Sequence, residues 1–112
     1  MASAAKQQIS EILNRLVLNG PAALSDAELV AILLRDSLKG SHLVDVATTM
    51  LREAGSLFQL LRSAQDGTFA GATPGQNATL SVSLELAKRH YEQTMLNAEA
   101  LESPAASKRF LI

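Results

Sequence analysis

The sequence predicts an all-α fold, a bundle of about five helices arranged as two helix-hairpin-helix units. Apolar residues recur at helical spacing through most of the 112 residues, and aromatic residues make up only 4% of the chain, so the core must be aliphatic. Gly and Pro separate these stretches, and small polar residues stand where helices would begin. Alternation of polar and apolar residues over a useful strand length is not found.

The first predicted helix has an apolar stripe at positions i, i+3, i+4, i+7 and i+8. The stripe consists of Ile9, Ile12, Leu13, Leu16 and Val17. The helix is expected to end before Asn19-Gly20-Pro21, because Gly can adopt a positive φ there and Pro cannot continue the hydrogen-bond ladder.

The start of the second helix is the sharpest local pattern in the chain. Ser25 stands as the N-cap with Glu28 three residues later, and Leu24 and Leu29 flank them, which predicts a capping box with a hydrophobic staple. The helix is expected to continue to about Arg35, with Ile32, Leu33 and Leu34 inside it and Leu33 on its core face.

A short turn is predicted from Asp36 to Ser41, with Gly40 available for a positive φ and Ser41 as the next N-cap. The third helix follows with Leu43, Ala47, Met50 and Ala54 on one face, and Gly55 ends it. Ser56 and Gln59 then have the spacing of another capping box, which predicts a short helix through Leu57, Leu60 and Leu61.

The remainder is predicted to be a loop from Asp66 to Gly75 and a long helix from about Gln76 to Met95. Ser103-Pro104 has the pattern of an N-cap followed by Pro at the first helical position. We therefore expect a helix-hairpin-helix domain over residues 1–100 and a linker or tail over residues 101–112.

Two stretches share one plan, an apolar helix, a tight turn with Gly and a helix opened by a small polar residue. One turns at Lys39-Gly40-Ser41 and the other between Gly71 and Gly75, so that Gly40 and Gly75 lie 35 residues apart. In such a unit the backbone N–H groups of the turn and the following helix start point at a phosphate. The predicted DNA-binding residues are Arg35, Lys39, Gly40, Ser41, His42, Gly71, Gly75 and Gln76.

The run from Gly20 to Arg35, GPAALSDAELVAILLR, resembles the opening pattern of RadC-like proteins. Lys39-Gly40, Gly55-Ser56-Leu57, the LELAKR run from Leu84 to Arg89 and Ser103-Pro104 follow in matching order. The resemblance covers roughly residues 15 to 105. It implies the N-terminal helix-hairpin-helix domain of a DNA repair protein family, a domain that normally precedes a JAB-type metalloprotease-like domain.

The second hairpin departs from the pattern of that family, which has a Lys-Gly-Ile-Gly-Pro-Ala-Lys type of turn before its last helix. Here the aligned stretch runs from Ala70 to Gln76, with Thr73 in place of the second Gly and no flanking Lys. Neither Lys nor Arg occurs from Ser63 to Ala87. A phosphate at this turn would meet backbone donors alone, so we expect the second hairpin to be degenerate.

Charge and composition exclude several classes of function. The net charge of −1 does not favour a polyanion, so DNA binding would have to be local and weak. The chain has no Cys and only two separated histidines, so we expect no metal, no cofactor and no catalytic residues. No apolar run approaches the ~18 residues of a membrane span, and we expect a cytoplasmic protein of bacterial origin that is not an enzyme.

The sequence leaves two functions open. The first is an accessory DNA-binding domain of a RadC-like protein, which contacts the DNA backbone without reading bases and is weakened by the loss of the hairpin lysines. The alternative is a protein–protein interaction or regulatory module that holds a partner protein or a C-terminal JAB-type domain. A surface on which Arg35, Lys39, Lys88 and Arg89 gather around the first hairpin would favour DNA.

Overall fold

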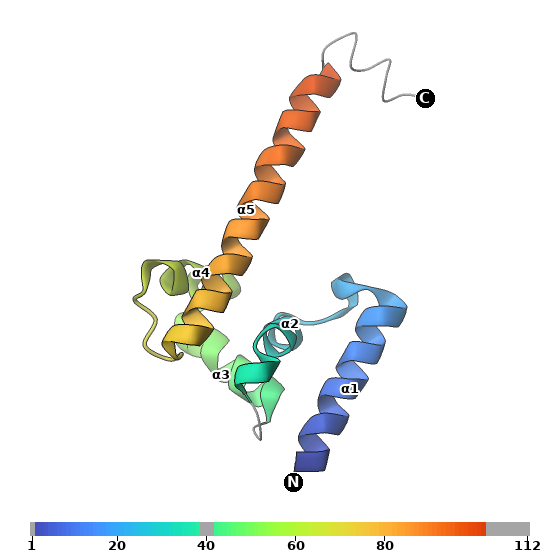
Figure 1. Ribbon diagram of the computed structural model, residues 1–112, viewed down its shortest axis with the longest axis vertical. Coiled ribbons are helices and arrows are strands. Elements are labelled where there is room, and N and C mark those ends of the chain that lie inside the picture. The colour runs from blue at the N-terminus through green and yellow to red at the C-terminus, as the bar shows by residue number, and fades with distance from the viewer. Residues whose placement is uncertain (1, 39–41, 103–112) are drawn as a thin grey trace. The chain divides into compact units, whose positions relative to one another are not determined.

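The computed structural model describes the backbone of residues 2–38 and 42–102 and the side chains of residues 7–38 and 42–98. These residues contain five α-helices, two short 3-10 helices and no strand, which confirms the all-α fold (Figure 1). The α-helices are α1 (Ala2–Asn19), α2 (Asp26–Leu33), α3 (Leu43–Ala54), α4 (Leu57–Asp66) and α5 (Pro74–Glu102). The 3-10 helices are η1 (Pro21–Ala23) and η2 (Arg35–Ser37).

The chain divides into two compact units, residues 1–81 and residues 82–112, and α5 passes from the first into the second. In the first unit α2 packs against α3, α3 packs against α4, and α1 contacts η1 and α2. The two hairpins that were expected from the repeat are therefore α2–α3 and α4–α5.

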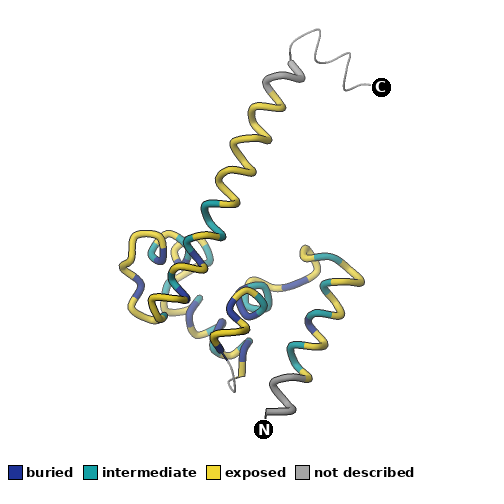
Figure 2. Tube along the Cα trace, viewed as in Figure 1, coloured by how far each residue is buried: buried dark blue, intermediate teal, exposed yellow. Residues whose placement is uncertain are grey.

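The core of the first unit is mainly aliphatic, as the composition predicts, and its buried residues come from α2 to α5 and the segments that join them (Figure 2). Leu60 on α4 and Leu80 on α5 are its largest fully buried side chains. The other members of this cluster are Val30, Ala31, Leu34, Leu38, Leu43, Ala47, Met50, Ala64 and Phe69. Burial of these apolar side chains is the main favourable term in folding.

Helix starts follow the predicted capping chemistry. Ser25 Oγ accepts a hydrogen bond from Glu28 N at 3.1 Å, and Glu28 Oε1 accepts one from Ser25 N at 3.0 Å, which completes the capping box of α2. Ser56 Oγ likewise accepts from Gln59 N at 3.1 Å at the start of α4. Each bond satisfies a backbone donor that has no partner inside its own helix.

Two helix ends lie where the glycine pattern placed them. α1 ends at Asn19, before Gly20 with φ of 83°, and α3 ends before Gly55 with φ of 104°. At both positions the backbone is in the region that residues with a Cβ rarely adopt. The predicted ends of the first and third helices are confirmed.

Three predicted features differ from the structure. The N-cap of α3 is His42 and not Ser41. α5 begins at Pro74, two residues before the predicted start, because Thr73 caps it and Pro is favoured at the first helical position. α5 also continues past Met95 to Glu102. Lys39, Gly40, Ser41 and the tail from Ser103 lie outside the described residues.

Two predicted core positions are exposed. Leu33 is 41% exposed, whereas the next residue, Leu34, is only 2% exposed, so the buried face of α2 passes through Val30 and Leu34. Val17, at the end of the predicted stripe on α1, is 82% exposed, whereas Ile12 is buried. In both cases two adjacent residues lie three and four positions after an apolar residue, so the helical period alone allows either one to be buried. Packing against the neighbouring helices decides which of the two is buried.

Candidate nucleic-acid interface

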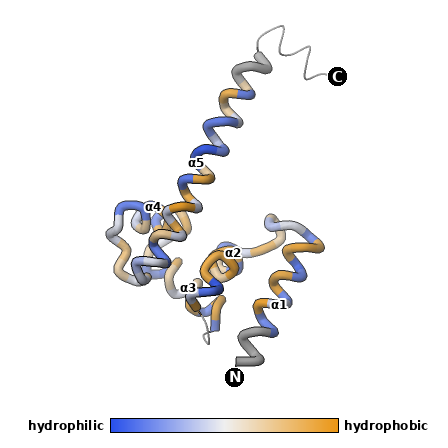
Figure 3. The backbone as a smooth tube through the Cα atoms, viewed as in Figure 1, coloured by the Kyte–Doolittle hydropathy of each residue, from blue (hydrophilic) through white to orange (hydrophobic). Residues whose placement is uncertain are grey.

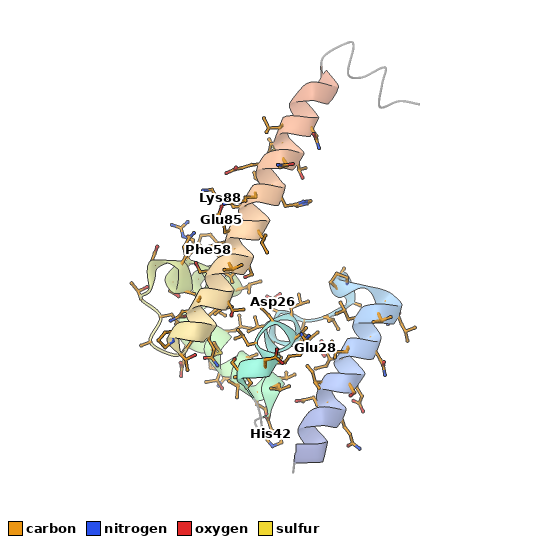
Figure 4. The ribbon with its side chains drawn as sticks, in the orientation of Figure 1. Asp26, Glu28, His42, Phe58, Glu85 and Lys88 are labelled. Carbon is orange, nitrogen blue, oxygen red and sulfur yellow. The ribbon has the colours of Figure 1, made fainter. Side chains whose placement is uncertain are left out.

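The structure describes the residues on either side of the turn of the first hairpin. Arg35 lies in η2, exposed, and its Nη1 donates a hydrogen bond to Ile32 O at 2.8 Å. His42 lies exposed at the start of α3, next to the undescribed segment (Figure 4). The three residues between them that were predicted to contact phosphate, Lys39, Gly40 and Ser41, are outside the described residues.

The N-terminus of α3 differs from those of α2, α4 and α5. Ser25, Ser56 and Thr73 each cap a helix through a side-chain oxygen, whereas His42 makes no side-chain cap hydrogen bond. The first-turn N–H groups of α3 therefore have no side-chain acceptor at the N-cap. Such groups, together with the helix dipole, are able to bind an anion.

Carboxylates stand near the same helix start. Asp36 follows Arg35 in η2, and Asp45 lies in the first turn of α3. Asp45 complements the helix dipole, but both charges repel a phosphate. The first hairpin therefore offers a phosphate mainly backbone N–H donors, because these carboxylates offset its positive charge.

The second hairpin uses its predicted ligand residue for a structural purpose. Gln76 is 8% exposed, and its backbone N donates to Thr73 Oγ1 at 3.1 Å while its Oε1 accepts from Thr73 N at 3.0 Å. Its Nε2 donates to Ser37 Oγ at 3.2 Å, and Ser37 Oγ in turn donates to Leu34 O at 2.8 Å. Its amide joins the start of α5 to η2, and DNA contact by Gln76 stays a prediction.

The glycines of the second hairpin have different surroundings. A Cβ added at Gly71 would lie 2.6 Å from Glu53 Oε2 and 2.6 Å from Phe69 Cζ, so Gly71 is needed for close approach of the turn to α3. Gly75 lies inside the first turn of α5, and the nearest atom to an added Cβ is 4.0 Å away. Neither glycine has a positive φ.

A shallow pocket of about 270 Å³ lies between α3 and the second hairpin. Its lining residues are Asp45, Val46, Thr49, Met50, Glu53 and Gly71. The carboxylates of Asp45 and Glu53 are among these residues, and negative charge near Gly71 disfavours a phosphate there.

Three of the six cations whose side chains are described are engaged elsewhere. Arg15 on α1 forms an ion pair with Glu28 on α2, and Arg89 Nε pairs with Glu85 Oε2 at 2.9 Å within α5. The Arg62 guanidinium lies 5.7 Å from the centroid of the Phe58 ring.

Glu28 joins the capping box to the packing of α1 on α2 (Figure 4). The hydrogen bond from Ser25 N and the hydrogen bond from the Arg15 guanidinium lower the pKa of the Glu28 carboxyl. The sequence pattern revealed the cap but not the ion pair, because Arg15 and Glu28 lie 13 residues apart. This ion pair links α1 to the start of α2.

The described part of the chain contains no group of three or more His, Cys, Asp or Glu side chains suited to holding a metal ion. None of its helices combines the length and the apolar character that crossing a membrane requires.

A comparison with protein families decides the relationship. Residues 13–77, from the second half of α1 to the first turn of α5, match the UPF0758 N-terminal family. The chain belongs to the UPF0758 family. This confirms the resemblance to the N-terminal domain of RadC-like proteins and covers the turns of both hairpins.

Relatives within the UPF0758 family support the assignment. The chain is 40% identical over 100 residues to a UPF0758 protein of Aeromonas salmonicida, with 87% of this chain and 45% of the relative covered. It is 42% identical over 99 residues to a UPF0758 protein of Stutzerimonas stutzeri, with 87% of this chain and 44% of the relative covered. The chain thus spans less than half the length of these relatives. No solved structure matches it.

Proposed function

We propose that this UPF0758 domain is an accessory DNA-binding domain that contacts the phosphate backbone at the first hairpin without reading base sequence. The observation that carries the proposal is the start of α3, whose N-cap, His42, makes no side-chain cap bond. A phosphate oxygen could supply the acceptor that the N-cap side chain does not, and the helix dipole favours the negative charge.

Two cations support the same location. Arg35 is exposed in η2, before the hairpin, and Lys39 lies within it in the sequence. Each would add a charge-assisted contact to the backbone donors. Asp36 and Asp45 limit the affinity, and the acidic pocket at Gly71 excludes the second hairpin from the contact. We therefore propose a single weak DNA contact at the first hairpin, and no contact at the second.

A titration of the 112-residue chain with labelled DNA tests this function. Binding should be in the non-specific range of ~10⁻⁴–10⁻⁶ M at physiological salt and equal for duplexes of unrelated sequence. Duplex, single-stranded and branched DNA should be compared at several salt concentrations. The absence of binding even at low salt would refute the proposal.

Interaction with a partner protein is a second candidate, favoured by apolar side chains at the end of α1. Val17 and Leu18 are 82% and 81% exposed, although they are large and adjacent. Exposed apolar patches of this kind often mark protein contacts. Two results together would favour this function. The chain would not bind DNA, and it would co-purify with the C-terminal half of a full-length relative unless Val17 and Leu18 were changed to Ser.

A further inference from the structure

Part of the surface of α5 in the second unit forms an apolar stripe, while Leu86 and Leu96 are exposed on the other side of the helix. At 100° per residue, Leu84, Ala87, Tyr91, Met95 and Ala98 fall within an arc of about 80°. Tyr91 is 65% exposed and Met95 is 45% exposed, and Ala87 and Ala98 are exposed as well. Figure 3 shows hydrophobic positions recurring along this helix. An exposed tyrosine and methionine on one face favour a partner surface.

We propose that this face binds the same face of a second copy of the chain, with the two helices antiparallel. A two-fold axis at Tyr91 places Leu84 opposite the partner's Ala98, and Ala87 opposite the partner's Met95. A large side chain then meets a small one on both sides of the centre, where the two Tyr91 rings meet. Such alternation of large and small residues is what close packing of two helices requires.

The charged residues along one edge of this face fit the same two-fold axis at Tyr91. Lys88 and Glu92 lie on the same side of the stripe, about 60° and 100° from its middle. In an antiparallel pair this edge faces itself, and Lys88 lies within about 3 Å, along the axis, of the partner's Glu92. Two reciprocal ion pairs would then form across the interface.

Lys88 and Glu92 are available for this contact. Neither side chain forms an ion pair among the described residues, whereas Glu85, which lies close to Lys88 (Figure 4), is paired with Arg89. In a parallel pair, the charged edge of one helix would face the other edge of the stripe on the partner helix. That other edge carries Thr94, Asn97 and His90, with no Lys or Glu side chain to pair with. Charge complementarity therefore favours the antiparallel arrangement.

The length of the face sets the expected strength. From Leu84 to Ala98 the helix rises about 21 Å, which is four turns. A contact of this size is at the low end for specific interfaces, so the dimer should be weak, with a Kd on the order of 10⁻⁵ M. This inference does not depend on the proposed DNA contact, since its residues lie in the second unit and not at the first hairpin.

Sedimentation equilibrium of the full chain over a concentration series tests the dimer. Tyr91→Glu should abolish it, because a carboxylate would be buried at its centre. The matched control is Leu86→Glu, at a residue that is 64% exposed on the other side of the helix, and it should leave the Kd unchanged. A chain that is monomeric at ~1 mM, or equal effects of the two variants, would overturn the proposal.

Charge exchange tests the orientation. Lys88→Glu and Glu92→Lys should each weaken the dimer about tenfold, since each places like charges together twice. The double variant should recover the original Kd, because the reciprocal pairs form again with reversed sign. Failure of the double variant to recover, with helix content unchanged by circular dichroism, would rule out the antiparallel pairing.

Cross-linking gives a second and independent readout, since the chain has no native Cys. A mixture of the Ala87→Cys and Met95→Cys chains should form a disulfide between the two variants under mild oxidation. Either variant alone should not, because its two thiols would lie about 12 Å apart along the axis. Cross-linking of the single variants would indicate a parallel pair and overturn the proposal.

Discussion

Single residues at the second hairpin have structural roles beyond the turn pattern that the sequence shows. The stretch from Ala70 to Gln76 resembles a phosphate-binding turn, but its residues serve the fold. Thr73 and Gln76 cap α5, and Gln76 also binds Ser37, 39 residues earlier in the chain. The local cap is readable from sequence, since Thr followed three residues later by Gln is a capping box. The contact with Ser37 is not, because no local spacing encodes it.

The two glycines of this hairpin are expected to respond differently to Ala. Gly71→Ala should destabilise the domain by roughly 1–3 kcal/mol, because the new Cβ would clash with the Phe69 ring and displace the Glu53 carboxylate. Gly75→Ala should be neutral or stabilising by up to ~1 kcal/mol, since Gly75 lies in open space within a helix. Urea denaturation of both variants measures the difference. Equal destabilisation would mean that the turn does not approach α3 as described.

Glu28 should make the stability of the domain depend on pH. Its pKa is lowered in the folded state by the bond from Ser25 N and then by Arg15, so the charged carboxylate stabilises the fold. This stabilisation is complete well above the unfolded-state pKa of about 4.3 and is lost as pH falls through the lower folded-state pKa. Glu28→Gln keeps an acceptor for the cap but loses the charge.

The measurement is the free energy of unfolding of the two proteins between pH 3 and pH 7, a range set by the usual glutamate pKa of about 4.3. The native protein should be the more stable at pH 7, and the difference should shrink as pH falls below about 4. A difference that is constant over this range would show that the Glu28 charge does not contribute.

At the scale of helices, the starts and stops were predictable and the buried faces were only partly so. Ser25, Ser56, Gly20 and Gly55 mark boundaries through local chemistry, and the structure confirms all four. The buried face of α2 was assigned to the wrong leucine. α2 has apolar residues on nearly every side, so periodicity cannot select one of them, and packing against α3 buries Leu34.

Adjacent leucines at the end of α2 give a matched test of that face. Leu34→Ala should cost ~2–5 kcal/mol, because its side chain is 2% exposed within the core cluster. Leu33→Ala removes the same atoms from a side chain that is 41% exposed, and it should cost under ~1 kcal/mol. Thermal or chemical denaturation compares them. The reverse order would place Leu33 in the core and contradict the packing of α2 on α3.

At the scale of the whole chain, family and fold follow from sequence, whereas function depends on surfaces that the sequence does not order in space. The run from Gly20 to Arg35 lies within the region that matches the family, which includes the turns of both hairpins. The surface around these hairpins combines few free cations with carboxylates of Asp36, Asp45 and Glu53. A domain of this charge can bind DNA only at a restricted place, and our account places it at the start of α3.

The most direct test of this placement compares three single variants in a salt-dependent DNA titration. Arg35→Ala and Lys39→Ala should each weaken binding to every sequence about equally and reduce the salt slope by about one. Arg52→Ala removes the same charge from the last turn of α3, about 15 Å from His42, and should leave the slope unchanged. Equal salt slopes for the three variants would contradict a contact at the first hairpin. Weaker DNA binding by the Arg52→Ala variant alone would contradict it as well.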